Sequence, residues 1–281
     1  MRVAYLGPAG TYSEEALRAS APAEVDEVPY PTIFEAVMAV HDGAVDRAVV
    51  PIENALEGAV AVTLDTLALE ARDVRIVAEV VHPVHHCLVA PRQLDLREIT
   101  RVVSHPQATA QCARFLRERL PGVERVIAPS TADAVLSVSG TDARAAALGS
   151  RLAAELYGCR VLVPNVEDRA DNVTRFVWLA PAADVSGAEP GIKTSLVFWG
   201  GDDHSPGWLV ACLRELADRG VNLTRIESRP RRTALGHYMF FVDLEGPADQ
   251  PPVSEALEAL RGRVERLRLL GSYGVIGHRP G

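Results

Sequence analysis

Short apolar segments alternate with amphipathic helical patterns along residues 1–180, and this alternation restricts the chain to few folds. The segment RVAYLG is a predicted strand, and the helical pattern TYSEEALRAS follows it, with Thr11 and Glu14 spaced as a capping box. Further on, TIFEAVMAVHDG predicts a helix that ends at Gly43, and RAVVPI predicts the next strand. Strands that alternate with helices are typical of an α/β sheet.

A sequence pattern that occurs twice suggests that this region consists of two similar lobes. The segments Pro31–Val40 and Pro129–Val138 share the pattern P-[ST]-x-x-x-A-V-x-x-V, and each is followed by a glycine and then a predicted strand. We therefore expect lobe one at about 1–77 and 165–180, and lobe two at about 78–164. A cleft between two such lobes is a common place for a small ligand.

The stretch APAADVSGAEPG, from Ala180 to Gly191, is rich in Ala, Pro and Gly and has no periodicity, so it predicts a linker over 181–191. It separates residues 1–180 from a smaller region, 192–275. The predicted elements of that region are IKTSLVFWG, WLVACLRELADRG, VNLTRIES, HYMFFVDLEG, VSEALEALRG and VERLRLLGSYG. Their βαββαβ order is the ferredoxin-like plan.

The bulk composition excludes several classes of protein. The 281 residues carry a net charge of −8, which argues against nucleic acid as a partner. No apolar run approaches the roughly 18 residues of a membrane span, and MRVAYLGPAG lacks the features of a signal peptide, so we expect a cytoplasmic protein with no membrane contact. The four cysteines form no CxxC pair, which predicts buried thiols in a reducing compartment.

Three loops share a predicted architecture, in which a strand ends, small or polar residues follow and a helix begins. They are LGPAGTYS (Leu6–Ser13), PIENALEG (Pro51–Gly58) and SHPQA (Ser104–Ala108). In open α/β sheets ligands bind at the carboxyl ends of strands, where helix N-termini offer free N–H groups to anions. Such loops could hold a small carboxylate without basic residues, or be only capped turns. GPAG does not match GxGxxG, so no dinucleotide cofactor is expected.

Several polar residues in and near these loops are candidates for chemistry. Glu53 and Asn54 follow the apolar run VVPI and belong at a strand end. His105 is either a proton donor or a helix cap. In HPVHHC, His82 and His86 share a face of an extended segment, but no further ligands for a metal are apparent, so no metal site is expected.

The segment DNVTRFVWLA (Asp171–Ala180) places a cluster of polar residues before an apolar strand. A strand entry needs no arginine, whereas a binding site can use one. In a strand Thr174 and Phe176 point to one face and Arg175 to the other, so we assign Thr174 and Phe176 to the cleft. Arg175 could pair bidentately with a carboxylate of the ligand only if the backbone turns at this point.

Taken together, these segments resemble the prephenate dehydratase family. The matching stretches are YLGPAGTYSEEA, VPIENALEG, HHCL, SHPQATAQC and DNVTRF. The C-terminal region resembles the ACT regulatory domain that accompanies this enzyme, with NLTRIESRP (Asn222–Pro230) as its signature. The resemblance covers nearly the whole chain, in order. It implies a two-lobed catalytic region like the type II periplasmic binding proteins over 1–180 and an ACT domain over 192–275.

The resemblance also implies the reaction and its site. The enzyme would convert prephenate to phenylpyruvate in phenylalanine biosynthesis, without a cofactor, and Thr174 would be essential for dehydration. Glu53 and His105 are candidate proton relays, and the helix N-termini at Thr11, Asn54 and Gln107 would hold the substrate's two carboxylates. The expected substrate-binding residues are Thr11, Tyr12, Ser13, Asn54, Gly58, Ser104, Gln107, Asn172, Arg175 and Phe176.

Regulation is implied in the same way. L-Phenylalanine would bind between paired ACT domains and inhibit, in an oligomer built from dimers, often a tetramer. The expected effector-binding residues are Gly207, Trp208, Leu209, Asn222, Leu223, Glu227, Ser228, Arg229 and Pro230. The family's regulatory helix usually begins Gly-Ala-Leu, whereas this one begins Gly207-Trp208-Leu209. If Trp208 points into the effector pocket, phenylalanine will fit poorly.

Two alternatives stay open at this point. An arogenate dehydratase acts on a substrate that differs from prephenate by an amine in place of the keto group, and the sequence does not decide between the two substrates. A non-catalytic amino-acid sensor would combine a binding-protein-like region with an ACT domain and would bind ligands without turnover.

Overall fold

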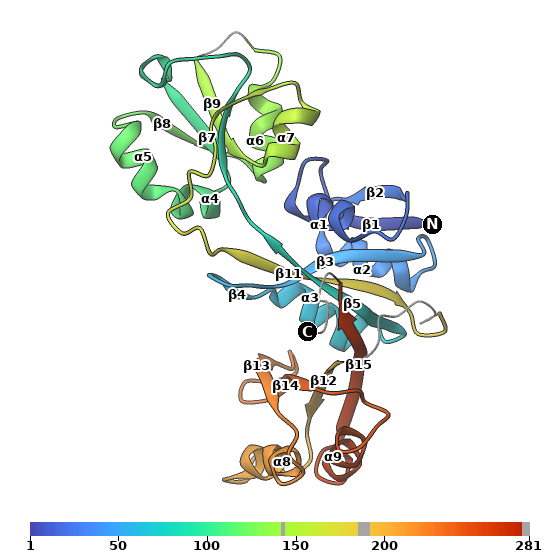
Figure 1. Ribbon diagram of the computed structural model, residues 1–281. Coiled ribbons are helices and arrows are strands. Elements are labelled where there is room, and N and C mark those ends of the chain that lie inside the picture. The colour runs from blue at the N-terminus through green and yellow to red at the C-terminus, as the bar shows by residue number, and fades with distance from the viewer. Residues whose placement is uncertain (142–143, 185–191, 277–281) are drawn as a thin grey trace.

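The computed structural model describes residues 1–141, 144–184 and 192–276, so most of the expected linker over 181–191 lies outside the described residues. Two lobes and a C-terminal domain follow one another along the length of the molecule (Figure 1). The elements of lobe one are β1 (Arg2–Leu6), α1 (Tyr12–Ser20), β2 (Asp26–Tyr30), α2 (Ile33–His41), β3 (Arg47–Asn54), β4 (Gly58–Ala59), α3 (Ala61–Asp65), the π-helix η1 (Thr66–Glu70), β5 (Val74–Pro83) and β11 (Val173–Pro181).

The sheet of lobe one has the strand order β5-β11-β3-β1-β2. β1 is parallel to β2 and β3, whereas β11 is antiparallel to both of its neighbours, β3 and β5. α2 buries Val37 and Val40 with Ile52 on one face of this sheet. α1 buries Leu17 on the other face, together with Trp178. Helices therefore cover both faces, as expected for an α/β lobe.

Lobe two is built around a second sheet, with the strand order β10-β6-β9-β7-β8. Its elements are β6 (Cys87–Ala90), the 3₁₀ helix η2 (Leu96–Glu98), β7 (Arg101–Ser104), α4 (Pro106–Gln111), α5 (Ala113–Arg119), β8 (Glu124–Ile127), α6 (Thr131–Val138), β9 (Ala145–Gly149), α7 (Arg151–Leu156) and β10 (Arg160–Val163). The chain leaves lobe one at the end of β5 and re-enters it at β11 (Figure 1).

The C-terminal domain has the predicted βαββαβ order. Its elements are β12 (Lys193–Trp199), α8 (Trp208–Ala217), β13 (Leu223–Pro230), β14 (Tyr238–Glu245), α9 (Val253–Arg261) and β15 (Arg266–Val275). The strand order β13-β14-β12-β15 is that of a ferredoxin-like sheet. The end of β15 pairs with β5 in parallel, through Gly274 with Ala78 and Val275 with Glu79, so this sheet continues into lobe one.

The helix N-termini follow the local sequence closely. Thr32 and Ser130 cap α2 and α6, the two helices that carry the repeated pattern. At α1 only half of the capping box forms: Thr11 accepts a hydrogen bond from the backbone N–H of Glu14, but the Glu14 carboxylate accepts from Gly10 instead of Thr11. Burial raises the pKa of Glu14, and the bond from Gly10 opposes this.

Two expectations from the composition concern membrane-spanning helices and the cysteines. None of their helices is both long and apolar enough to cross a membrane. The four cysteines are free thiols; Cys87, Cys112 and Cys212 are buried, and Cys159 is partly exposed.

Candidate active site

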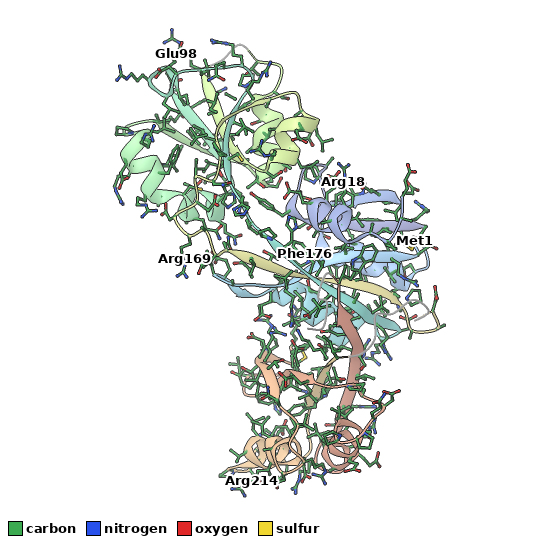
Figure 2. The ribbon with its side chains drawn as sticks, viewed as in Figure 1. Met1, Arg18, Glu98, Arg169, Phe176 and Arg214 are labelled. Carbon is green, nitrogen blue, oxygen red and sulfur yellow. The ribbon has the colours of Figure 1, made fainter. Side chains whose placement is uncertain are left out.

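A cavity of about 340 Å³ lies between the two lobes. Lobe one lines it with the β1–α1 loop, β3 and β11, and lobe two lines it with the N-termini of α4 and α6. Figure 2 shows Phe176 near the middle of the molecule, far from Glu98 and Arg214 at its two ends. The cavity brings together nine of the predicted site residues, namely Thr11, Tyr12, Ser13, Asn54, His105, Gln107, Asn172, Thr174 and Phe176. Glu53, Gly58, Ser104 and Arg175 are not among its described lining residues.

Among the described helices that begin at this cavity, four have an N-cap side chain that accepts a hydrogen bond. Thr11, Thr32, His105 and Ser130 are the N-caps of α1, α2, α4 and α6, and each accepts a hydrogen bond from a backbone N–H of its own helix. Helix N-termini carry partial positive charge. No lysine or arginine occurs among the described residues that line the cavity. An anion bound there would therefore meet helix ends, amides and hydroxyls instead of basic side chains.

No helix begins at Asn54, so the helix N-terminus expected there was wrong; the chain first passes through β4, and α3 begins at Ala61. Oδ1 of Asn54 accepts hydrogen bonds from the backbone N–H groups of Leu56 (2.9 Å) and Glu57 (3.0 Å), and the chain turns into β4. These bonds fix the orientation of the amide, because Nδ2 must then face the opposite way. Nδ2 donates to Oδ1 of Asn172 and to Oγ1 of Thr174, each at 2.9 Å.

The hydroxyl of Thr174 is thus an acceptor toward Asn54, and its own proton remains available. No described residue offers this proton an acceptor within hydrogen-bonding distance, while the side chain lines the cavity. Phe176 borders the same cavity and lies edge-on to His82, with ring centroids 6.4 Å apart. The cavity face of β11 therefore combines one hydroxyl donor with an aromatic surface.

A chain of hydrogen bonds continues from Asn172 toward lobe two. Nδ2 of Asn172 donates to Oε1 of Gln111 (3.1 Å), and Nε2 of His86 lies 3.0 Å from the same oxygen. Because an amide oxygen can only accept, His86 carries a proton on Nε2. Burial lowers the pKa of His86, so the ring is neutral at pH 7, and its Nδ1 accepts from the phenol of Tyr12 at 2.7 Å.

His86 and Gln111 were not predicted as site residues, although the sequence carried a signal for each. His86 shares the face of HPVHHC with His82, which is a pattern of a binding site as much as of a metal site. Gln111 lies four residues after Gln107, which places both on one face of a helix. Ser130, the N-cap of α6, was visible only as part of the repeated pattern.

Arg175 and Glu53 lie on the opposite face of the sheet, toward the C-terminal domain. Nη1 of Arg175 donates to Oδ2 of Asp243 at 2.7 Å and lies 3.6 Å from Oε2 of Glu79. Nε of Arg175 lies 3.5 Å from Oε2 of Glu53, and Nε of Arg225 lies 3.6 Å from the same oxygen. Burial disfavours the charge of Arg175, but the nearby carboxylates outweigh burial and hold its pKa above the ordinary value.

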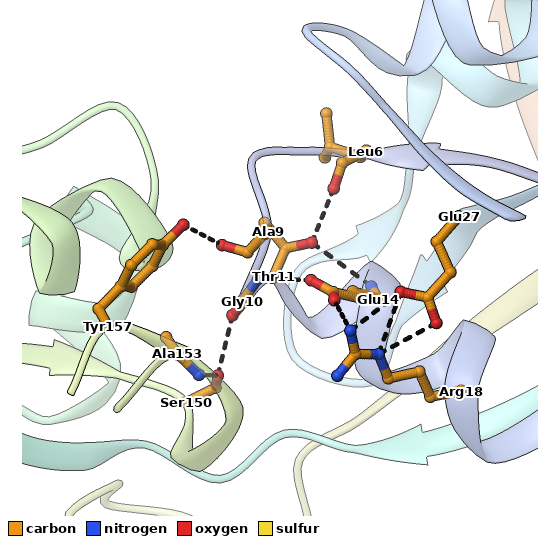
Figure 3. Close-up of polar contacts among 10 residues, drawn as sticks. All are labelled: Leu6, Ala9, Gly10, Thr11, Glu14, Arg18, Glu27, Ser150, Ala153 and Tyr157. Atoms are coloured by element: carbon orange, nitrogen blue, oxygen red, sulfur yellow. Dashed lines mark hydrogen bonds and ion pairs between the residues drawn. The ribbon is translucent and has the colours of Figure 1, made fainter. Parts of the chain in front are cut away.

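The two lobes also touch directly beside the cavity (Figure 3). The phenol of Tyr157 donates to the carbonyl of Ala9 (2.6 Å), and the hydroxyl of Ser150 donates to the carbonyl of Gly10 (2.9 Å). Gly10 has φ +90°, and a Cβ there would lie 2.8 Å from Cβ of Ala153. Only glycine fits this position, both because of its left-handed backbone and because α7 approaches it so closely.

A second, smaller pocket of about 200 Å³ lies in the C-terminal domain at the start of α8. Gly207, Trp208 and Leu209, three of the residues expected to bind the effector, line it. The indole of Trp208 packs against Phe198 and Phe240, and its Nε1 donates to the carbonyl of Arg263 (3.1 Å). The remaining predicted effector residues are not among its described lining; they are Asn222, Leu223, Glu227, Ser228, Arg229 and Pro230.

One group among the described residues has the composition of a metal site. The ligand atoms of Asp203, His204 and His237 all lie within 4.8 Å of one another, near the second pocket. However, Nη1 of Arg231 lies 3.7 Å from Oδ2 of Asp203. The guanidinium already compensates this carboxylate and would repel a cation bound beside it.

Known proteins are similar to this chain over most of its length. The family model "Prephenate dehydratase" matches residues 3–184, and the model "ACT domain" matches residues 195–262. A prephenate dehydratase from Amycolatopsis methanolica is 40% identical over 273 residues, which cover 97% of this chain and 88% of the relative. The crystal structure of prephenate dehydratase from Arthrobacter aurescens in complex with L-Phe has a TM-score of 0.89 at 36% identity and covers 100% of this chain and 92% of that one.

A third similar protein carries another activity. The structure of GqqA, described as a novel type of quorum quenching acylase, has a TM-score of 0.85 at 33% identity and covers 97% of both chains. The family match nevertheless spans most of the chain, and both predicted regions are matched in order. The chain therefore belongs to the prephenate dehydratase family and carries an ACT domain at its C-terminal end.

Proposed function

We propose that this chain converts prephenate to phenylpyruvate, with release of CO2 and water, in the cavity between the lobes. The hydrogen bond between Asn54 and Thr174 is the observation that carries the proposal. Because Asn54 donates to the threonine oxygen at 2.9 Å, the threonine proton is left for a ligand in the cavity. A hydroxyl held in this way can donate to the hydroxyl group that leaves the substrate ring.

The reaction needs little more than this donor and a place for two carboxylates. The bond between the ring and its carboxylate breaks, and its electron pair enters the ring as CO2 departs. At the opposite end of the ring the C–O bond breaks, and the oxygen leaves with its electron pair. One proton completes the water molecule, so each turnover consumes a proton, and formation of the benzene ring drives the reaction.

Thr174 polarises and positions the leaving hydroxyl in this scheme, because a threonine hydroxyl is too weak an acid to act alone. His105 is our candidate for delivering the proton. Its Nδ1 accepts from the backbone N–H of Gln107 at 3.3 Å, which leaves Nε2 for the cavity. We do not assign Glu53 to this step, because its carboxylate faces Arg175 and Arg225 across the sheet.

The substrate carboxylates are assigned to the helix N-termini. α1, α2 and α6 all start at the cavity, and the lining residues described there include no basic side chain. The backbone N–H groups and the partial positive charge of these helices favour anions. Phe176 would lie against the apolar face of the substrate ring.

We also propose feedback inhibition by L-phenylalanine at the second pocket, in a dimer or a tetramer built from dimers. The relative from Arthrobacter aurescens was solved with L-Phe. The predicted effector residues Leu223, Glu227, Ser228, Arg229 and Pro230 lie on β13, the outermost strand of the sheet, and are not among the described residues that line the pocket with Trp208. The β13 of a second copy could therefore complete the pocket. Trp208 is fixed by Arg263 and two aromatic rings, which leaves room beside it. We place the reaction in the cytoplasm.

The competing activities make different demands on the cavity. An acylase needs a nucleophile next to a general base. No serine or threonine hydroxyl among the described lining residues is hydrogen-bonded to a histidine ring; the phenol of Tyr12 is the hydroxyl bound to His86. The carboxylates of prephenate, of arogenate and of an amino acid bound by a sensor would all fit helix N-termini. Kinetic measurements therefore have to distinguish the two dehydratase activities from the sensor.

A direct assay tests the proposal. The purified chain is incubated in parallel with prephenate, arogenate and an N-acyl homoserine lactone. The expected result is phenylpyruvate from prephenate, with turnover reduced by added phenylalanine. Phenylalanine from arogenate at a higher kcat/KM would identify an arogenate dehydratase. Ligand binding without any product would indicate the sensor, and hydrolysis of the acyl amide bond of the lactone substrate alone would overturn the proposed reaction.

A further inference from the structure

We propose that Arg175 is a positioning residue, through which the ACT domain sets the geometry of Thr174. This inference rests on the proposed role of Thr174 in dehydration. Arg175 does not touch the cavity, so any effect it has on turnover must pass through its neighbours.

The first support is the register of two strands. Thr174 pairs with Asn54 across β11 and β3, and the next pair of the same ladder is Arg175 with Glu53. Successive residues of a strand point to opposite faces. The pair with the proposed catalytic hydrogen bond therefore faces the cavity, and the adjacent pair faces the ACT domain. A shift of Arg175 and Glu53 would move Thr174 and Asn54 through the shared backbone.

The second support is the charge cluster that holds the ACT-facing pair. Three cations and three anions meet there, namely Arg175, Lys193, Arg225, Glu53, Glu79 and Asp243. Asp243 is 2% exposed, and its other oxygen accepts a hydrogen bond from Ser195. The best-formed contact of Arg175 is thus with a carboxylate that the ACT domain fixes in place.

The third support is that the guanidinium of Arg175 finds few hydrogen-bond acceptors in its own lobe. Among the described residues, Nε and Nη2 of Arg175, Nη2 of Arg225 and Oε2 of Glu79 are buried without a hydrogen-bond partner. The contacts of Arg175 to Glu53 and Glu79 are 3.5 and 3.6 Å, against 2.7 Å to Asp243. The position of Arg175 therefore depends chiefly on the ACT domain.

The cluster also reaches the strand expected to bind the effector. Arg225 lies on β13 and pairs with Asp243 of β14, while it contacts Glu53 of lobe one. An effector that moves β13 would move Arg225 and Asp243 with it. Phenylalanine bound elsewhere on this strand would thereby affect the pairing of Thr174 with Asn54 without contacting the cavity itself.

The decisive variant is Asp243→Asn, which keeps the shape of the side chain and removes its charge. We expect kcat for prephenate to fall about tenfold with little change in KM, since the hydroxyl is misplaced in the transition state and not in substrate binding. We also expect the phenylalanine concentration for half-inhibition to change. If Asp243→Asn does not fold, Arg225→Gln is a milder substitute. It should change the phenylalanine concentration for half-inhibition in the direction that would be observed for Asp243→Asn.

Asp65→Asn is the matched control. Asp65 lies in α3 and binds Arg229 and Arg232 of the ACT domain, so it is a second contact between the domains that does not involve β3 or β11. We expect its kcat to stay within about twofold of the wild type. Equal losses of kcat in Asp65→Asn and Asp243→Asn would mean that domain contact alone matters, and would overturn the inference.

Two further measurements separate this inference from the proposed function. Arg175→Lys should recover part of the kcat lost in Arg175→Gln, and Arg175→Gln should add little to Asp243→Asn in the double variant. Folded Asp243→Asn with wild-type kcat and inhibition would refute the positioning role, even if Thr174→Ala is inactive. Full activity of Thr174→Ala would instead remove the proposed function.

Discussion

The two faces of β11 show how one strand serves two different environments. On the cavity face, Thr174 takes part in a neutral network in which the amide groups of Asn54 and Asn172 donate in fixed directions. On the other face, Arg175 sits among carboxylates, several of whose contacts exceed 3.5 Å. The neutral face therefore defines the position of one proton, whereas the charged face joins two domains. Variants on the cavity face should consequently affect turnover alone, whereas variants on the charged face should affect stability and, through the shared backbone, turnover to a smaller extent.

The largest effect should come from Arg175→Ala, and it should be on stability. Removal of this guanidinium leaves the buried carboxylates of Asp243 and Glu79 undercompensated, and we expect a loss of about 3 kcal/mol in the free energy of unfolding. This loss is at the lower end of the range for a broken buried ion pair, because Lys193 still contacts Glu79 and Arg225 still lies near Asp243. Urea unfolding measures the loss.

Arg261→Ala is the control for that measurement, since Arg261 forms an exposed ion pair with Glu258 on α9. Exposed pairs contribute little, so its unfolding curve should match the wild type. Similar curves for Arg175→Ala and wild type would show that the charged face does not hold the domains together.

Thr174→Ala should affect turnover and leave stability almost unchanged. The variant lacks the hydroxyl that we propose as donor to the leaving group, so kcat should fall on the order of 100-fold or more. Thr174→Ser keeps the hydroxyl and should retain much of the activity, although without the methyl group its rotamer is less restricted. The assignment fails if Thr174→Ala is folded and fully active.

Asn54→Asp should have a smaller effect of the same kind. The carboxylate can still accept the turn's N–H bonds from Leu56 and Glu57, but it has no N–H to donate to Thr174. The threonine proton would then turn toward the carboxylate, and kcat should fall about tenfold. Unchanged steady-state kinetics in this variant would contradict the direction we assign to the Thr174 hydroxyl.

The smallest effect concerns pH and His86. Because burial lowers the folded-state pKa of His86, the unfolded chain takes up this proton at a higher pH than the folded chain. Its contribution to stability is therefore fully present above the unfolded value of about 6.5 and is lost as the pH falls toward the folded value.

We expect the urea midpoint to drop between pH 7.5 and pH 5.5 by less in His86→Gln than in the wild type. The chain has eight histidines, and the other seven are common to both proteins, so the difference isolates this ring. An identical pH dependence in the two proteins would show that His86 is not held neutral by the fold.

The architecture was largely predictable because it depends on short-range patterns. The alternation of strands and helices predicted the α/β lobes, the βαββαβ order predicted a ferredoxin-like C-terminal domain, and strand periodicity separated Thr174 from Arg175. The sequence does not predict which residue Arg175 contacts, since no local pattern points to Asp243, which is 68 residues away in sequence. Periodicity can state which face a residue occupies, but only the packed domains reveal what covers that face.

The errors have similar physical origins. PIENALEG predicts a helix N-terminus at Asn54, but the Asn54 side chain accepts hydrogen bonds from Leu56 and Glu57 and forms a turn instead. An asparagine side chain can favour either structure, and the residue type alone does not decide between them. His86 and Gln111 were missed because their roles depend on a hydrogen-bond chain that crosses from one lobe to the other.

The pairing of β15 with β5 has a consequence for any shortened form of the chain. Without the ACT domain, the N–H and C=O groups of β5 near Ala78 and Glu79 would lose their partners and face solvent. Uncovered strands of this kind recruit other chains and promote aggregation. The ACT domain would thus act as a lateral cover that keeps lobe one from associating with other chains through its sheet.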